Sequence, residues 1–209
     1  MPASRFLPNN PSRRAFVERM TCLAMASLAF SASSQAQTTW PTKPIKLVIP
    51  FAPGGVTDTS GRIIAEYLSK KLGQQVVADN RPGASGNIGT SLVAQAPADG
   101  YTLVLGFDGT MVINPHVFAK VPFDTLKDFA PVGKIGDAVL ILVSNPGVPA
   151  KSLQDVIALS KSTSGGLSYG TSGTGGTPHI AGELLAQRTG AQLTHVPYKG
   201  GGQAMTDVL

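Results

Sequence analysis

The sequence predicts an α/β fold in which parallel strands are flanked by helices. Short apolar or β-branched runs alternate along the chain with longer segments whose apolar residues have helical spacing. In addition, two glycine-rich segments, residues 50–58 and 169–177, each join such a run to a helical segment. Strands that alternate with helices in this way form βαβ units, and these units build parallel sheets.

In the first half of the chain, strands are predicted at residues 45–49, 75–79 and 102–107. A helix is predicted over residues 60–72, where five apolar residues recur at helical spacing, and Gly73 is a suitable stop. A second helix is predicted near residues 88–95, before Pro97. These elements make one β-α-β-α-β unit.

The second half repeats the pattern. Residues 138–144 form a nearly continuous apolar run, which predicts a buried central strand, and residues 167–170 and 192–197 predict two more strands. Ser152 and Asp155 have the spacing of a capping box, which predicts a helix that runs to about residue 161.

The last two predicted helices follow glycine-rich segments. One covers residues 178–189, with Thr177 as its N-cap and Pro178 at its first position, where a missing N–H costs nothing. The other begins near Gly202 and reaches the last residue, Leu209, within about two turns.

Residues 1–36 are interpreted as an export signal. Four arginines precede a short apolar core at residues 23–30, which is too short to span a bilayer. Ser34-Gln35-Ala36 then provides the small residues that a signal peptidase requires. The Arg13-Arg14 pair leaves both ordinary secretion and twin-arginine export open, and either route predicts a periplasmic protein.

The composition without this signal excludes several classes of function. The whole chain has a net charge of +5, but residues 1–36 hold four arginines and one glutamate, so the remainder carries only +2. The remainder contains no basic patch interleaved with aromatic residues, which is the pattern that would indicate nucleic-acid binding. The single cysteine, Cys22, lies inside the signal, so no cysteine-based metal site is expected, and no cofactor is expected.

The two glycine-rich loops are candidate anion-binding segments. Gly54 and Gly55 leave the backbone bare, so that a ligand can approach the amides, and the following helix points its free N–H groups into the same space. The loop at residues 169–177 adds hydroxyl groups that can donate to carboxylate oxygens. Together they predict a site for a small carboxylate between the loops; the alternative is that both are ordinary tight turns.

Residues suited to catalysis are scarce. Neither loop matches a nucleotide-binding fingerprint, and the histidines, His116, His179 and His195, are too scattered to suggest a metal site. His179 either contacts a ligand or supports the second loop. Asp58 either caps or precedes the first helix, or binds a ligand's ammonium group. Ser85 and Tyr198 lie near predicted strand ends, so they are expected beside the ligand.

Five motifs, in order, resemble the Bug-type periplasmic receptors of tripartite tricarboxylate transporters, also called the TctC family. They are Pro50-Phe51-x-Pro53-Gly54-Gly55-x-x-Asp58-x-x-x-Arg62, Asn80-Arg81-Pro82-Gly83-Ala84-x-Gly86-x-x-Gly89, Ala98-Asp99-Gly100-Tyr101-Thr102-Leu103, Ser172-Gly173-x-Gly175-x-x-x-His179 and His195-Val196-Pro197-Tyr198-Lys199-Gly200. The resemblance runs from Trp40 to Leu209. It departs at Gly176, where the family often has serine.

The resemblance implies a two-domain receptor of the Venus-flytrap type, with parallel sheets flanked by helices. The expected domains are residues 37–131 and 132–209, and the second is expected to be incomplete because family members continue for on the order of a hundred further residues. Such a receptor closes on a small di- or tricarboxylate and delivers it to a membrane transporter. A monomer without a cofactor is implied.

The resemblance and the loops together give a set of candidate ligand-binding residues. The first half of the chain contributes Phe51, Pro53, Gly54, Gly55, Thr57, Asp58, Ser85, Gly106 and Asp108. The second half contributes Thr171, Ser172, Gly173, Thr174, Gly175, Thr177, His179 and Tyr198. An alternative function stays open, namely a secreted α/β enzyme that acts on a small anion with His179 or Asp58 as the acid–base group.

Overall fold

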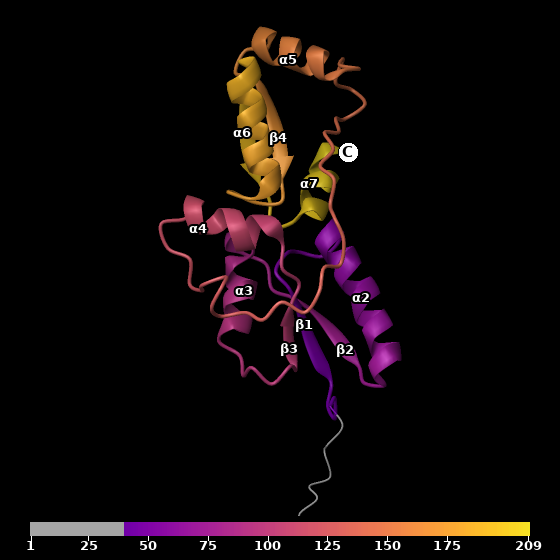
Figure 1. Ribbon diagram of the computed structural model, residues 1–209. Helices are drawn as coiled ribbons and strands as arrows, with labels where there is room; N and C mark the ends of the chain where they lie inside the picture. The colour runs from indigo at the N-terminus through magenta and orange to yellow at the C-terminus, as the bar shows by residue number, and fades with distance from the viewer. Residues whose placement is uncertain (1–39) are drawn as a thin grey trace, which may run out of the picture. The chain divides into compact units, whose positions relative to one another are not determined.

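The structure, a computed structural model, describes residues 40–209 (Figure 1). The predicted export signal at residues 1–36 lies outside the described residues. The described part has the predicted α/β class: parallel strands form two sheets, and helices pack beside them. No helix in residues 40–209 combines the length and the apolar character needed to cross a bilayer.

The first sheet has the strand order β2-β1-β3, and both pairings are parallel. Its strands are β1 (Ile45–Ile49), β2 (Val76–Asn80) and β3 (Thr102–Val104). The central strand, β1, supplies the largest fully buried apolar side chains of the described part, Ile45, Val48 and Ile49. A central parallel strand is covered on both faces, and four of the five residues of β1, all except the exposed Lys46, are buried and apolar.

Two helices cover the first sheet. Helix α2 (Val56–Leu72) packs beside β1 and β2, and Gly73 ends it in the left-handed conformation, as predicted. This helix begins four residues before the predicted start at residue 60. Its first turn was missed because periodicity reports only apolar residues that are buried, whereas Val56 in that turn is exposed. Helix α3 (Asn87–Ala94) lies within about one residue of its prediction.

The second sheet pairs β4 (Leu167–Thr171) in parallel with β5 (Leu193–Pro197). Helix α5 (Leu153–Ser162) precedes this sheet, α6 (Thr177–Thr189) joins its two strands, and α7 (Gly201–Val208) follows it. Half of the predicted capping box forms at α5: the Asp155 amide donates to Ser152 Oγ at 3.2 Å. The Asp155 carboxylate instead accepts from the Lys151 amide, one residue before the cap.

The start of helix α6 differs from its prediction. Gly176 is the N-cap, with no side-chain hydrogen bond, so Thr177 is already helical and Pro178 takes the second position. The Thr177 hydroxyl does not cap the helix, because it donates to Asp108 Oδ2 at 2.9 Å. A contact distant in sequence has therefore replaced the local one.

The strand predicted at residues 138–144 is wrong. This segment has no regular secondary structure, and the side chains of Val139 and Ile141 are 85% and 78% exposed. An apolar run becomes a buried strand only where other strands pair with its backbone and cover its side chains. Within the described residues, the two sheets are β2-β1-β3 and β4-β5, and neither contains this segment.

Short helical turns connect strands to the longer helices. They are a 3₁₀ turn, η1 (Ala84–Gly86), a π-helical turn, η2 (Gly109–Ile113), and the single-turn helix α4 (Asn114–Val117). Turn η1 links β2 to α3, and η2 with α4 follows β3. These turns lie at the carboxyl ends of the strands, the edge at which parallel sheets place binding sites.

Gly89 tests how closely α3 must approach the end of β1. A Cβ at this position would lie 2.7 Å from the Arg81 carbonyl oxygen and 2.9 Å from Pro50 Cα. We expect Gly89→Ala to lower the free energy of unfolding by about 1–3 kcal/mol, although alanine favours helices, because backbone atoms cannot yield as a side chain can. Chemical denaturation measures this.

Gly201→Ala is the matched control, because a Cβ there meets no atom within 4 Å. We expect it to leave stability nearly unchanged. Equal changes in the free energy of unfolding for the two substitutions would show that the close approach of α3 to β1 does not cause the destabilisation.

Candidate functional site

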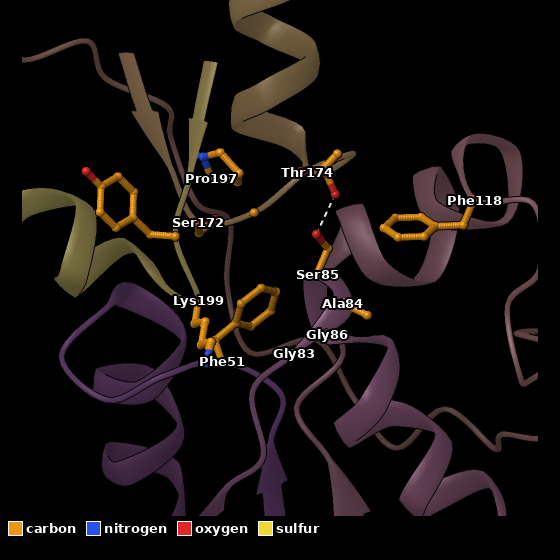
Figure 2. A pocket seen from close by; sticks show the side chains of 12 residues that line it. Phe51, Gly83, Ala84, Ser85, Gly86, Phe118, Ser172, Thr174, Pro197 and Lys199 are labelled. Carbon is orange, nitrogen blue, oxygen red and sulfur yellow. Dashed lines mark hydrogen bonds between the residues drawn. The ribbon is translucent and has the colours of Figure 1, made fainter. Parts of the chain in front are cut away.

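A cavity of about 280 Å³ lies where strands of both sheets end (Figure 2). Four segments line it, and each follows the carboxyl end of a different strand. Phe51 follows β1, residues 83–86 follow β2, residues 172–174 follow β4, and residues 197–199 end and follow β5. Phe118, from the end of α4, completes the wall. The volume is close to the lower limit for small-molecule sites.

The turn at residues 83–86 has an uncommon backbone. All four residues have positive φ, and two of them, Ala84 at +46° and Ser85 at +52°, are not glycine. This region is unfavourable for a residue with a Cβ, so the surroundings must hold it. Thr110 Oγ1 and Asn114 Nδ2 donate to the Ser85 carbonyl at 2.8 and 3.0 Å, and both side chains are fully buried.

The Ser85 side chain joins this turn to the second glycine-rich loop. Its hydroxyl donates to the Thr174 carbonyl, the contact drawn as a dashed line in Figure 2. Gly173 makes the close approach possible, because a Cβ there would lie 2.6 Å from Ser85 Oγ. The cavity is therefore closed on this side by a contact between segments 89 residues apart.

The second glycine-rich loop satisfies two of its own amides. The Gly173 amide donates to Thr171 Oγ1 at 3.2 Å, and the Gly175 amide donates to His179 Nδ1 at 3.0 Å. Of the two roles left open for His179, its observed contact is the loop-supporting one. Ser172, Gly173 and Thr174 remain on the cavity wall.

A cluster of ring side chains lies behind this loop. The rings of His179 and His195 stack with 3.8 Å between centroids, and His195 Nε2 lies 2.6 Å from Thr171 Oγ1. Burial, together with the neighbouring His179, lowers the pKa of His195 below its usual value. The Tyr169 hydroxyl donates to Glu183 at 2.8 Å, and burial with this carboxylate raises the pKa of Tyr169.

The first glycine-rich loop already holds an anion of its own. The Gly54 amide donates to Asp58 Oδ2 at 3.0 Å, and Arg62 and Asn80 donate to the same carboxylate. Burial by itself would raise the pKa of Asp58, but these hydrogen bonds and the Arg62 charge outweigh it and lower the pKa. Asp58 lies in the first turn of α2. Its carboxylate accepts from the Gly54 amide, which the sequence analysis had assigned to a ligand.

The glycine pair of this loop faces the chain itself. A Cβ on Gly55 would lie 3.3 Å from the Gly201 amide nitrogen, and one on Gly202 would lie 2.8 Å from the Gly54 carbonyl carbon. The start of α7 thus packs on the bare backbone that was expected to receive a ligand. The conformational freedom of Gly54 is also required, since its φ is +89°.

The predicted site residues divide into three groups. Those that line the cavity are Phe51, Ser85, Ser172, Gly173, Thr174 and Tyr198. Those that lie in the first loop and along the segment after β3, outside the lining, are Pro53, Gly54, Gly55, Thr57, Asp58, Gly106 and Asp108. Those that belong to the second loop or to the first turn of α6, outside the lining, are Thr171, Gly175, Thr177 and His179. Asp108 and Thr177 hydrogen-bond to each other, and neither lines the cavity.

Sequence reasoning missed six lining residues: Gly83, Ala84, Gly86, Phe118, Pro197 and Lys199. Five of them belong to the quoted motifs at residues 80–89 and 195–200, so their clustering at strand ends could have included them. Phe118 had no such signal, because it lies in an irregular segment after a single helical turn.

The cavity suits an anion. Lys199 is the one charged residue among those that line it, and hydroxyl groups come from Ser85, Ser172, Thr174 and Tyr198. The Lys199 side chain is exposed, and none of the ion pairs of residues 40–209 involves it. No group of three or more metal-ligating side chains occurs within the described range.

The chain matches one protein family and several named proteins in sequence. Residues 61–209 match the TctC family, described as the tripartite tricarboxylate transporter family receptor. Protein BugT of Bordetella pertussis is 39% identical over 188 residues, which cover 90% of this chain and 57% of that protein. A UPF0065 protein of Cupriavidus necator is 36% identical over 200 residues, which cover 94% of this chain and 61% of that protein.

Two solved structures are also similar to this chain in fold and in sequence. Rpa4515 of R. palustris, solved with adipate, has a TM-score of 0.73 and 38% identity, with 81% of this chain and 56% of that chain covered. MatC of Rhodopseudomonas palustris, with bound malate, has a TM-score of 0.75 and 31% identity, with 81% and 57% covered. The chain therefore spans somewhat more than half the length of the relatives it matches.

Asp58 is expected to make stability depend on pH in the acid range. Its folded-state pKa lies below 3.8, so its contribution is complete above that value and is lost as pH falls through the folded pKa. At pH 7 we expect Asp58→Asn to cost about 1–3 kcal/mol, because the donors from Gly54, Arg62 and Asn80 lose a buried, charged acceptor. The difference in unfolding free energy from wild type should shrink as pH falls below 3.8.

Glu66→Gln is the control for Asp58→Asn, since the Glu66–Lys70 pair on the same helix is exposed and should contribute little. A cost that stays constant from pH 7 to pH 2 would contradict the role given to the Asp58 charge.

His195 is expected to make stability depend on pH nearer to neutrality. Its folded-state pKa lies below 6.5, so the unfolded chain takes up protons first, and stability falls as pH drops below about 6.5. We expect the melting temperature of wild type to fall between pH 7.5 and 5.5, and that of His195→Gln to fall less. A variant that loses as much as wild type would remove His195 as the cause.

Proposed function

Because the chain belongs to the family of tripartite tricarboxylate transporter receptors, we propose that it binds a small organic carboxylate outside the cytoplasm and delivers it to a membrane transporter. The cavity at the strand ends is the proposed binding site. Family members are periplasmic solute-binding proteins of transport systems and not enzymes.

The observation that carries the proposal is the chemistry of the cavity wall. Of the residues that line the cavity, none is acidic and one, Lys199, is cationic. Of the cavity's four hydroxyl groups, those of Ser85 and Tyr198 already donate to the Thr174 carbonyl and to Asp207, which leaves the hydroxyls of Ser172 and Thr174 to donate to a ligand. Hydroxyl donors and a lysine stabilise a carboxylate, whereas an ammonium ligand would find no carboxylate to pair with. The solved relatives support the same class of ligand, because one was solved with adipate and another with malate.

The residues that we propose to hold the carboxylate differ from the first sequence-based set. Ser172, Thr174 and Lys199 face the cavity from the second half of the chain, and the strained turn at residues 83–86 faces it from the first half. Gly54 and Asp58 are proposed to brace the first loop, since they bond to each other. His179 is proposed to brace the second loop in the same way.

The wider setting follows from the family and is part of the proposal. We propose that residues 37–131 and 132–209 belong to two domains that meet at the cavity. Residues 1–36 would direct export, and the exported protein would act as a monomer that meets the membrane subunits of its transporter. No cofactor takes part.

Binding is tested with the full chain after removal of the proposed signal. Isothermal titration with malate, succinate, adipate and citrate should show saturable binding to at least one of them, and ligand should raise the melting temperature. Incubation should leave the acid chemically unchanged. Turnover of the acid, or binding of amines and sugars in preference to carboxylates, would overturn the proposal.

Lys199 provides the sharpest variant. We expect Lys199→Met to weaken carboxylate binding about fivefold, because a charged hydrogen bond is lost at an exposed site. The effect should shrink between about 0.05 and 0.5 M salt, because salt screens exposed charges. Lys151→Met, an exposed lysine outside the cavity, is the control; equal losses in both variants would remove Lys199 from the site.

A further inference from the structure

Two histidines that do not line the cavity hold the second glycine-rich loop at both of its ends. His179 Nδ1 accepts from the Gly175 amide at 3.0 Å. His195 Nε2 lies 2.6 Å from Thr171 Oγ1, the same atom that accepts from the Gly173 amide at 3.2 Å. Between Thr171 and Gly175 lie the three loop residues that line the cavity. The two histidines are therefore placed to set the backbone of the candidate site from outside the cavity.

The contact with Gly175 determines which nitrogen of the neutral His179 ring carries the proton. Because the Gly175 N–H donates, Nδ1 presents its lone pair and the proton is on Nε2. Nε2 lies 3.5 Å from Glu183 Oε1, an acceptor that suits the same tautomer. A second proton can enter the ring only at Nδ1, where it would meet the N–H of the buried Gly175. Protonation of His179 thus removes the acceptor of this amide.

The titratable groups that face the two histidines come from three elements. His195 lies on β5, Tyr169 on β4 and Glu183 on α6. The two imidazole rings stack with 3.8 Å between centroids, so a positive charge on one opposes a charge on the other, and they titrate as a coupled pair. The Glu183 carboxylate accepts from the Tyr169 hydroxyl at 2.8 Å and faces His179 Nε2. One carboxylate can therefore balance the first positive charge of the pair, but not a second.

We propose that His179 and His195 make carboxylate binding depend on pH: the second loop has its binding conformation while His179 is neutral, and affinity falls when His179 takes up a proton. This inference rests on the proposed function and adds a form of regulation to the same site. His179 is a positioning residue, because it acts on the ligand through the loop backbone. The direction is diagnostic, since a protonated histidine that contacted the carboxylate directly would strengthen binding on acidification.

The first test measures affinity from pH 7.5 to pH 5.5 by isothermal titration with the full chain, with malate, succinate and adipate as probes. In wild type, affinity should fall about fivefold over this range, the equivalent of one hydrogen bond. Carboxylic acids titrate near pH 4, and the remaining titration of the probes affects all variants alike. An affinity that stays constant, or that rises on acidification, overturns the inference.

Two variants of His179 separate its titration from its support of the loop. Asparagine has an oxygen on Cγ where histidine has Nδ1, so His179→Asn can accept from the Gly175 amide but cannot take up a proton. It should show saturable binding with nearly the same affinity at pH 7.5 and pH 5.5. His179→Ala has no acceptor, so it should bind about as weakly at pH 7.5 as wild type does at pH 5.5. A fall in His179→Asn as large as that in wild type overturns the inference.

His116→Asn is the matched control, because His116 is exposed, lies on α4 and does not line the cavity. It should keep both the wild-type affinity and its fall with pH. The amide resonance of Gly175 reports on the contact itself in a nuclear magnetic resonance titration without ligand. It should shift with pH in step with the ring resonances of His179 in wild type, and stay fixed in His179→Asn. A Gly175 resonance that does not respond in wild type overturns the inference.

The outcomes distinguish this inference from the proposed function. If malate, succinate, adipate and citrate all fail to bind wild type at pH 7.5, the proposed function fails and the regulation falls with it. If at least one of them binds, and wild type and His179→Asn share one pH profile, only the regulation fails.

Discussion

The hydrogen bonds from Thr110 and Asn114 to the Ser85 carbonyl hold the turn on which the candidate site depends. Two non-glycine residues in the left-handed region cost about 1–3 kcal/mol each, whereas a hydrogen bond contributes only about 1 kcal/mol net. The two bonds therefore offset the strain only in part, and interactions elsewhere in the fold must offset the rest. Asn114 Oδ1 is itself buried without a partner, so this support is achieved at some cost.

The strained turn places Ser85 where it can join the two halves of the chain. Its hydroxyl meets the Thr174 carbonyl, and Gly173 leaves room for that contact. Gly109 permits a second close approach, since a Cβ there would lie 3.0 Å from the Thr177 amide nitrogen. The glycine-rich loops thus serve contact between segments of the chain as much as access for a ligand. The cavity is the space that these contacts enclose.

Charge is distributed unevenly around this space. Asp58 neutralises the first loop from within, through the Gly54 amide and Arg62, so that loop offers little attraction to an external anion. Lys199 lines the candidate cavity, and no acidic residue is among that lining. Attraction for a carboxylate is therefore expected from Lys199 and from the hydroxyl groups of Ser172 and Thr174, and not from the glycine pair.

By itself, the sequence determined the alternation of strands and helices, the glycine stop after α2 and the gathering of loops at the carboxyl ends of parallel strands. These features follow from local periodicity and local backbone chemistry, which act over a few residues. Only the tertiary structure decided which partner each polar group takes: Gly54 bonds to Asp58, and Thr177 bonds to Asp108 instead of capping its helix. It also decided that the apolar run at residues 138–144 is not a strand, because pairing depends on distant segments whose positions no local pattern encodes.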